Sequence, residues 1–221
     1  MGMNDDRWDY IQQYSREVFG RQDGHLAGLM DEAVKAGLPN IAVSADVGRL
    51  LMMLTSMTRG QLAIELGTLG GYSGIWLARG LKTNGRLITI EREPAHADFA
   101  QAQFERADVD DRVEIRRGAA LEVLPQLADE LGPDSVDVVF IDAVKVEYAQ
   151  YWRIVRPLIA PGGLVMADNV LGGGAWSIND VGHEQRDAVD TFNRLVADDP
   201  EFEAVVVPLR QGVIVGRRKN D

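Results

Sequence analysis

The chain has 221 residues, of which 46% are hydrophobic and 26% charged, a composition typical of folded globular proteins that excludes an intrinsically disordered chain. Its 23 basic and 34 acidic residues give a formal net charge of −11, which disfavours binding to nucleic acid through the phosphate backbone. The absence of cysteine excludes disulfides, thiolate metal sites and cysteine nucleophiles.

The first part of the sequence, up to about residue 60, has helical patterns. Apolar residues recur with a period of about 3.6 over 8–19 and again over 25–36. Gly37 follows the second segment, and Ser44 is expected to be the N-cap of a third helix. We therefore expect extra N-terminal helices over about residues 4–58.

Beyond Gly60, strand patterns alternate with helical ones. Short apolar runs predict strands at 62–67, 86–91, 112–118, 137–142 and 162–168. Helical segments of about 10–15 residues between them are typical of βαβ units, so we predict an α/β fold with a doubly wound, Rossmann-like, mostly parallel sheet. A helix around 183–198 and strands at 202–209 and 212–216 predict a C-terminal antiparallel hairpin. We expect one domain over 1–221, with its α/β core from about residue 60 onward.

Acidic side chains lie at the ends of four of the five predicted parallel strands. Glu65, Glu91 and Asp142 end three of them, and Asp168 with Asn169 ends a fourth. In open α/β sheets, ligands bind outside the carboxyl ends of the strands. Such a gathering of negative charge is costly unless a cation or hydrogen-bond donors offset it. The sequence therefore predicts a ligand site at this edge of the sheet.

The loop after the first strand, ELGTLGGYSG, narrows the choice of ligand. It matches neither the G-x-G-x-x-G dinucleotide fingerprint nor a P-loop. Glu91 lies 26 positions after Glu65, and a carboxylate in that place can accept hydrogen bonds from both ribose hydroxyls of an adenosine. Glu65 suits an amine better than a phosphate. S-Adenosylmethionine combines an adenosine with an amino-acid cation and therefore fits both carboxylates. The alternative interpretation is that the loop is only a tight βα turn and that Glu91 is a solvated strand end.

Three segments carry a family resemblance: AIELGTLGGYSGIWLA, VVFIDAVKVEYAQYW and VMADNVLGGG. They closely resemble the metal-dependent O-methyltransferases of the catechol and caffeoyl-CoA type, and the resemblance extends from about Ile41 to the C-terminal RQGVIVG. It implies cofactor contacts from Val43, Glu65, Gly67, Thr68, Ser73, Glu91, Ala120 and Asp142. It also implies that Asp142, Asp168 and Asn169 bind a divalent metal, and that Lys145 is catalytic together with Asp142.

Two positions depart from the family pattern. Val144 replaces the second aspartate of the usual D-A-D-K, and Ala119 replaces the aspartate of the usual G-D-A after the third strand. The first change would loosen contacts near the cofactor, and the second removes another acid. Neither alters the expected metal ligands.

The implied metal set makes chemical sense. Two carboxylates and an amide oxygen suit Mg²⁺, with Ca²⁺ or Mn²⁺ also possible, and they leave room for two substrate oxygens. A phenol bound to the cation acidifies, and Lys145 could take its proton before the oxygen attacks the cofactor methyl. We predict a cytoplasmic O-methyltransferase that depends on S-adenosylmethionine and a divalent cation, acts on a small aromatic vicinal diol, and does not bind membranes.

Several alternatives stay open. The acceptor could be a hydroxylated tRNA base, although the acidic balance argues against it, or the chain could be a non-catalytic adenosine-binding module. Asp142 alone could cap a helix, Asn169 could be a loop residue, and Lys145 could be a surface lysine. Trp176 could line the substrate mouth or pack in the core, and the three histidines are given no role. The apolar faces of the N-terminal helices, and the family's habit of pairing there, predict a homodimer.

Overall fold

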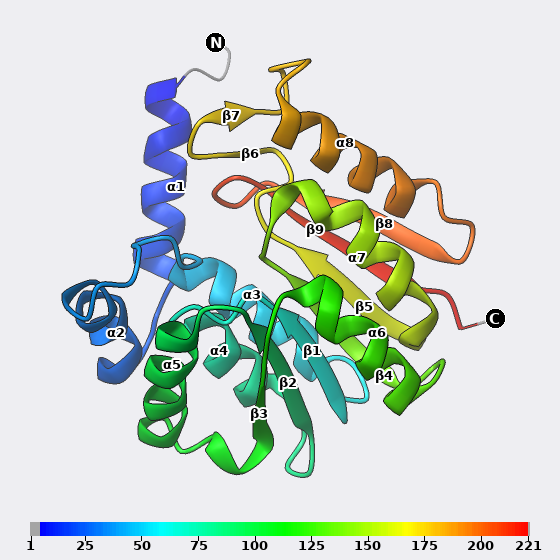
Figure 1. The fold of residues 1–221 in the computed structure, drawn as a ribbon. Helices are drawn as coiled ribbons and strands as arrows, with labels where there is room; N and C mark the ends of the chain where they lie inside the picture. The colour runs from blue at the N-terminus through cyan, green and yellow to red at the C-terminus, as the bar shows by residue number, and fades with distance from the viewer. Residues whose placement is uncertain (1–4, 221) are drawn as a thin grey trace.

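A seven-stranded sheet forms the centre of the fold, which the computed structural model describes over residues 5–220 (Figure 1). The strand order is β3–β2–β1–β4–β5–β9–β8; the first five pair in parallel, and β9 and β8 are antiparallel. The strands are β1 (Leu62–Leu66), β2 (Arg86–Glu91), β3 (Val113–Arg117), β4 (Val136–Ile141), β5 (Ile159–Ala167), β8 (Phe202–Val207) and β9 (Val213–Arg218). The predicted sheet and C-terminal hairpin are confirmed.

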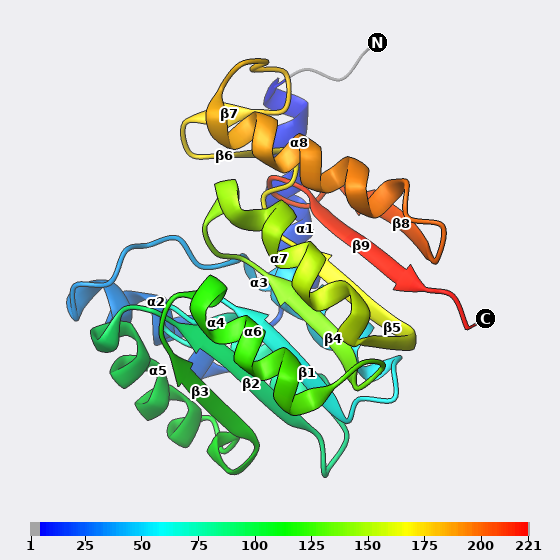
Figure 2. The ribbon, with the colours of Figure 1, turned by 45° about the vertical axis from the view of Figure 1, so that its right-hand side comes forward.

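Helices cover both faces of the sheet, as Figures 1 and 2 show together. One face packs against α2 (Gly24–Lys35), α3 (Ala45–Ser56), α4 (Tyr72–Gly80) and α5 (Pro94–Arg106). The other packs against α6 (Ala120–Leu131), α7 (Tyr148–Val155) and α8 (Glu184–Ala197). Short 3₁₀ turns, η1 to η3, lie at Asp110–Arg112, Lys145–Glu147 and Arg156–Leu158.

The central strands are apolar on both faces because each face has its own helical layer. On β4, Val138 and Phe140 belong to the core under α2–α5, whereas Val139 and Ile141 belong to the core under α6–α8. All four side chains are fully buried. This two-sided burial explains why the sequence shows continuous apolar runs here rather than an alternating pattern.

The N-terminal helices begin with α1 (Asp5–Phe19). It lies outside the layers that cover the sheet, next to the segment that connects β5 to α8 (Figures 1 and 2). Residue 4, where we expected this region to start, and the ends of the expected 1–221 domain lie outside the described residues. Ser44 precedes α3 as predicted but makes no side-chain capping bond; its hydroxyl donates to Asp46, which accepts the backbone N–H of Val47 instead.

The glycine-rich loop after β5 contains an element that the sequence did not predict. A two-stranded hairpin forms from β6 (Gly172–Gly173) and β7 (Trp176–Ser177). Trp176 is almost fully buried and joins the core under α6–α8. Among the helices that the structure describes, none is long and apolar enough to cross a membrane.

Candidate active site

A cavity of about 800 Å³ opens at the carboxyl ends of the parallel strands. It lies beside β1 and β4, where the strand order reverses, which is the place where doubly wound sheets bind ligands. Nine of the residues predicted for the site line it: Val43, Gly67, Thr68, Ser73, Glu91, Ala120, Asp142, Lys145 and Asn169. The structure thus brings most of the predicted set to one cavity; the two predicted residues that do not line it, Glu65 and Asp168, are fully buried.

The tight turn after β1 depends on a glycine. Gly67 has φ of +96°, and a Cβ at this position would lie 2.2 Å from the carbonyl oxygen of Asp142. The backbone N–H of Asp142 donates to the carbonyl of Leu66 at 2.9 Å. Only glycine allows the ends of β1 and β4 to come this close, and this contact places the loop and Asp142 on the same wall of the cavity.

Glu91 holds the glycine loop in place. Its Oε2 accepts the backbone N–H groups of Thr68 at 3.2 Å and Leu69 at 2.8 Å, and its Oε1 accepts that of Glu93 at 2.9 Å. A carboxylate can accept about four hydrogen bonds, so Oε1 keeps capacity for a ligand hydroxyl. His96, to which the sequence gave no role, also lines the cavity, with its Nδ1 3.7 Å from Oε1.

Glu65 lies behind the cavity wall rather than on it. The side chain is fully buried, and its oxygens accept the hydroxyls of Ser73 at 2.6 Å and Thr89 at 2.7 Å. Burial raises the pKa of Glu65 to about 7, although these two hydrogen bonds oppose the shift. Because Ser73 stands between Glu65 and the cavity, a direct contact between Glu65 and the cofactor stays a prediction.

The predicted metal ligands follow the ends of β4 and β5. The backbone N–H of Asp168 donates to the carbonyl of Ile141 at 3.1 Å, which aligns the two strand ends. Asp168 is fully buried, and its Oδ1 has no hydrogen-bond partner among the described residues. Burial, with the nearby carboxylate of Asp142, raises the pKa of Asp168 above its ordinary value, while Arg210 and Lys145 oppose the shift.

Asn169 has a backbone conformation that suits its residue type. Its φ is +62°, in the left-handed region that asparagine tolerates better than most residues. Its Nδ2 donates to Oε1 of Gln211 at 3.1 Å, so the amide oxygen is left for another partner.

Lys145 is held by Asp142, which was predicted for the site, and by Tyr148, which was not. Its Nζ donates to Oδ1 of Asp142 at 2.7 Å and to the hydroxyl of Tyr148 at 2.6 Å. The Tyr148 hydroxyl lies 3.2 Å from the carbonyls of Ile141 and Asp168, to which it donates. Burial and the two aspartates raise the pKa of Tyr148 well above its ordinary value, so it stays protonated and can hold Lys145 in position.

The side chains at the ends of β4 and β5 offer oxygen donors for a divalent cation. Within residues 5–220, no three His, Cys, Asp or Glu side chains gather in a metal-binding group, and the expected set has only two carboxylates with one amide. Asp168 nevertheless offers a buried oxygen without a partner, beside a second carboxylate. These are the hard oxygen donors that Mg²⁺ requires, so the residues fit such an ion.

Several cavity residues were missed by the sequence analysis. Arg210 and Gln211 reach the cavity from the turn between β8 and β9. The predicted hairpin was the available signal, because its turn had to lie beside the end of β5. Trp176 both lines the cavity and packs in the core. The N-cap of the next turn is Val144, not Asp142, which removes the helix-capping alternative for Asp142.

Comparison with known proteins defines the class. Residues 16–219 match the model of the O-methyltransferase family. The chain therefore belongs to this family, which confirms the predicted enzyme class over a non-catalytic module and agrees with the sheet topology and with the cavity at the strand ends.

Particular relatives and solved structures are similar along most of the chain. A catechol O-methyltransferase of Niastella koreensis is 35% identical over 207 residues, covering 94% of this chain and 93% of the relative. One of Mycobacterium tuberculosis is 43% identical over 152 residues, with 69% and 67% covered. The O-methyltransferase of Bacillus cereus in complex with SAH superimposes with a TM-score of 0.85 at 33% identity, covering 97% of this chain and 99% of that one. TomG of Streptomyces achromogenes, an O-methyltransferase of tomaymycin synthesis in complex with SAM, gives 0.84 at 33% identity, with 99% and 100% covered.

Proposed function

We propose that the enzyme transfers the methyl group of S-adenosylmethionine to one hydroxyl of a small aromatic vicinal diol, with a divalent cation, Mg²⁺ first, held by Asp142, Asp168 and Asn169. The observation that carries the proposal is the buried, unpartnered Oδ1 of Asp168 beside a second carboxylate and Lys145. The names of the two catechol O-methyltransferase relatives support the substrate class.

The cofactor would lie along the glycine loop. Glu91 has acceptor capacity for ribose hydroxyls, and Gly67, Thr68 and Ser73 line the same wall. The complexes of two similar structures with SAM and SAH support this choice. Ala120 lies at the start of α6, next to Ala119, so the adenine would be bound there without the aspartate that the family pattern has. S-Adenosylmethionine supplies a methyl group bound to a positively charged sulfur.

The cation would be held by Asp142, Asp168 and the amide oxygen of Asn169. Such an ion binds two adjacent oxygens at once and lowers the pKa of a hydroxyl. The protein prepares for it by burying Asp168 and by fixing Asn169 in its left-handed conformation, so these two ligands themselves would need little reordering.

Lys145 is positioned to take the proton of the reacting hydroxyl. As the free amine, Nζ would accept that proton at the moment when the hydroxyl oxygen bonds to the methyl group that S-adenosylmethionine would supply, with the neutral thioether as the leaving group. Tyr148 and Asp142 limit the movement of Nζ through hydrogen bonds of 2.6 and 2.7 Å. The amine and the reacting oxygen therefore meet in a fixed geometry, which is the source of much of the expected rate.

The exposed side of α1 supports the homodimer that we also propose. Tyr10 and Phe19 are 69% and 59% exposed, and Ile11, Tyr14 and Val18 are exposed as well. Five exposed apolar side chains on one helix are typical of an interaction surface. Light scattering of the full chain should give twice the monomer mass; a monomer at all protein concentrations would refute the dimer.

Methyl transfer from labelled S-adenosylmethionine to a panel of phenols tests the function. The assay is run with Mg²⁺ and with excess chelator, and circular dichroism monitors the fold in both. We expect transfer to catechols that chelator abolishes and Mg²⁺ restores, with no change in the fold. Full turnover in chelator would contradict the metal requirement.

A further inference from the structure

The turn between β8 and β9 contacts both residues of the Asp168–Asn169 pair. Nη1 of Arg210 lies 3.3 Å from Oδ2 of Asp168, and Oε1 of Gln211 accepts Nδ2 of Asn169 at 3.1 Å. The backbone reinforces this contact, because the N–H of Leu171 donates to the carbonyl of Gln211 at 2.8 Å. The turn is thus attached to the segment that carries two of the expected metal ligands.

Helix α1 holds the same turn from the other side. Oε1 of Gln12 accepts the backbone N–H of Arg210 at 2.7 Å, and its Nε2 donates to the carbonyl of Pro208 at 3.2 Å. Arg210 has φ of +51°, a conformation that is unfavourable for a long side chain and needs support from its surroundings. Gln12 supplies part of that support, so α1 helps to aim the Arg210 guanidinium at Asp168.

The charges of the site are balanced within the protein. Arg210, with 26% of its side chain exposed, faces the fully buried Asp168, and Lys145 pairs with Asp142. Two cationic side chains therefore offset two carboxylates. A divalent cation at these carboxylates would meet the repulsion of both cationic groups, and the repulsion is weakly screened because the site is partly buried.

We propose that Arg210 is an internal counter-cation that competes with the divalent metal for Asp168 and thereby sets the metal affinity of the enzyme, with Gln12 as its positioning residue. This inference rests on the proposed metal site. A guanidinium is a diffuse, weakly hydrated cation at a contact of 3.3 Å, so a hard divalent ion can displace it. Arg210 lowers the affinity without closing the site.

Binding of Mn²⁺ to the full chain without substrate, followed by electron paramagnetic resonance of the free ion, tests this. Arg210→Gln should tighten Mn²⁺ binding by about fivefold or more, because it removes the competing charge. Arg210→Lys, which keeps the charge, should stay closer to wild type. Arg217→Gln is the matched control, because Arg217 lies on β9 but contacts Asn220 rather than Asp168. Its loss should change the Mn²⁺ affinity by less than about twofold, because solvent and salt screen the charge of a side chain remote from the site.

Gln12→Leu adds a test of positioning. It should also tighten Mn²⁺ binding, by less than Arg210→Gln, and should add nothing in the Arg210→Gln background, because the two changes act through one contact. Equal gains in both backgrounds would overturn the positioning role. Thermal unfolding of each variant shows that the chain is folded.

Asp168→Asn separates the two possible failures. If it abolishes Mn²⁺ binding while Arg210→Gln leaves the affinity unchanged or weaker, the metal site holds and the competition is refuted. If Mn²⁺ binds equally well to Asp168→Asn, or does not bind to any variant, the proposed metal site fails and this inference fails with it.

Discussion

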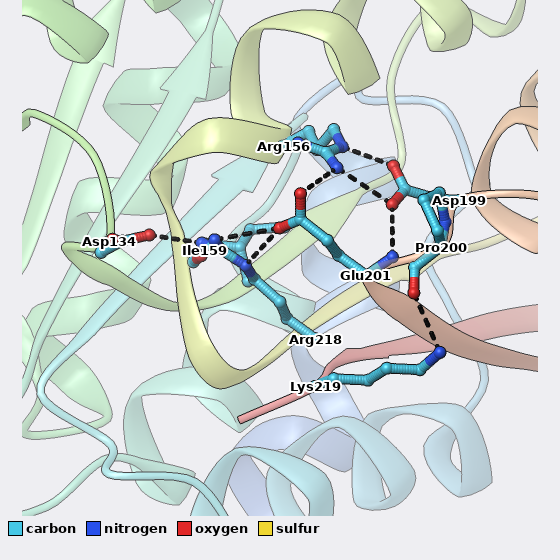
Figure 3. A network of polar contacts seen from close by, with 8 residues as sticks. All are labelled: Asp134, Arg156, Ile159, Asp199, Pro200, Glu201, Arg218 and Lys219. Atoms are coloured by element: carbon cyan, nitrogen blue, oxygen red, sulfur yellow. Dashed lines mark hydrogen bonds and ion pairs between the residues drawn. The ribbon is translucent and has the colours of Figure 1, made fainter. Parts of the chain in front are cut away.

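At the amino ends of β4 and β5, carboxylates and arginines form a network of ion pairs (Figure 3). At the carboxyl ends of the same strands, Asp142 lines the cavity and Asp168 is fully buried close to it. In the network, Arg156 binds both Asp199 and Glu201, and Arg218 binds Glu201 and Asp134. The hydrogen bond from Arg156 is the main cause that lowers the pKa of Asp199 and of Glu201.

At the cavity end, burial has the opposite effect. The pKa of Glu65 is raised to about 7, and that of Asp168 is raised as well. Arg210 pairs with Oδ2 of Asp168, but Oδ1 of Asp168 has no hydrogen-bond partner among the described residues.

The comparison shows two uses of the same residue types. In the network, complete pairing lets the carboxylates contribute to folding. At the cavity end, incomplete pairing lowers the stability of the fold but leaves oxygens available. A cation or hydrogen-bond donor that binds these oxygens therefore gains favourable interaction energy and stabilises the folded chain. Variants at the two ends should therefore separate activity from stability.

The largest effect is expected for Asp168→Asn. Removing a ligand of the proposed cation should lower methyl transfer by at least about 100-fold. The free energy of unfolding should change by less than about 1 kcal/mol, because the lost pairing with Arg210 is balanced by relief of burial and of repulsion from Asp142. Initial rates with a catechol and urea unfolding of the unliganded chain measure the two quantities. If the variant loses activity only because it unfolds, the carboxyl end would serve stability just as the amino end does, and the proposed difference between the two ends would be wrong.

Glu65→Gln should change the pH dependence of stability. The pKa of Glu65 is about 7 in the folded chain and 4.5 in the unfolded chain. The protonated carboxyl therefore stabilises the fold fully below pH 4.5, and this contribution is lost as the pH rises to about 7. Over that window Glu65 accounts for about 3 kcal/mol of lost stability. Urea unfolding at about pH 5 and about pH 8 should show a smaller decrease for the variant than for wild type. The exposed Glu105→Gln is the control; equal decreases in all three proteins would show that the Glu65 pKa is ordinary.

Glu91→Ala should weaken binding of S-adenosylmethionine by about 1–3 kcal/mol, the range for hydrogen bonds to a charged group. Glu91 also orders the loop by accepting the N–H groups of Thr68 and Leu69, so part of the loss comes from the loop. Isothermal titration calorimetry measures the affinity. An unchanged affinity would mean that the adenosine binds elsewhere.

Asp199→Asn should have the smallest effect on function. It weakens the pairing with Arg156 at the amino end, and we expect a loss of about 1–2 kcal/mol in unfolding free energy with kcat and KM unchanged. It is the matched partner of Asp168→Asn, because each variant exchanges one largely buried aspartate for its amide. A decrease in kcat would show that the amino end also influences the site.

Sequence periodicity was enough to predict the sheet, because strands buried on both faces leave continuous apolar runs. It also brought Asp142 and Asp168 to one edge, because parallel strands share their carboxyl ends. It could not show that Ser73 separates Glu65 from the cavity, since the distinction depends on side-chain direction. It also missed Arg210, whose approach to Asp168 depends on a hairpin turn 42 residues further along the chain.

The proposed role of the cation is tested by comparing kcat/KM for 3,4-dihydroxybenzoate with kcat/KM for 4-hydroxybenzoate in saturating Mg²⁺ and S-adenosylmethionine. The two compounds differ by one hydroxyl, so the comparison isolates the second oxygen. If a cation at Asp142, Asp168 and Asn169 binds both oxygens, the diol should react at least about 100-fold faster, since the pair both orients and activates the acceptor. Equal values for the two compounds would contradict the proposed role of the cation.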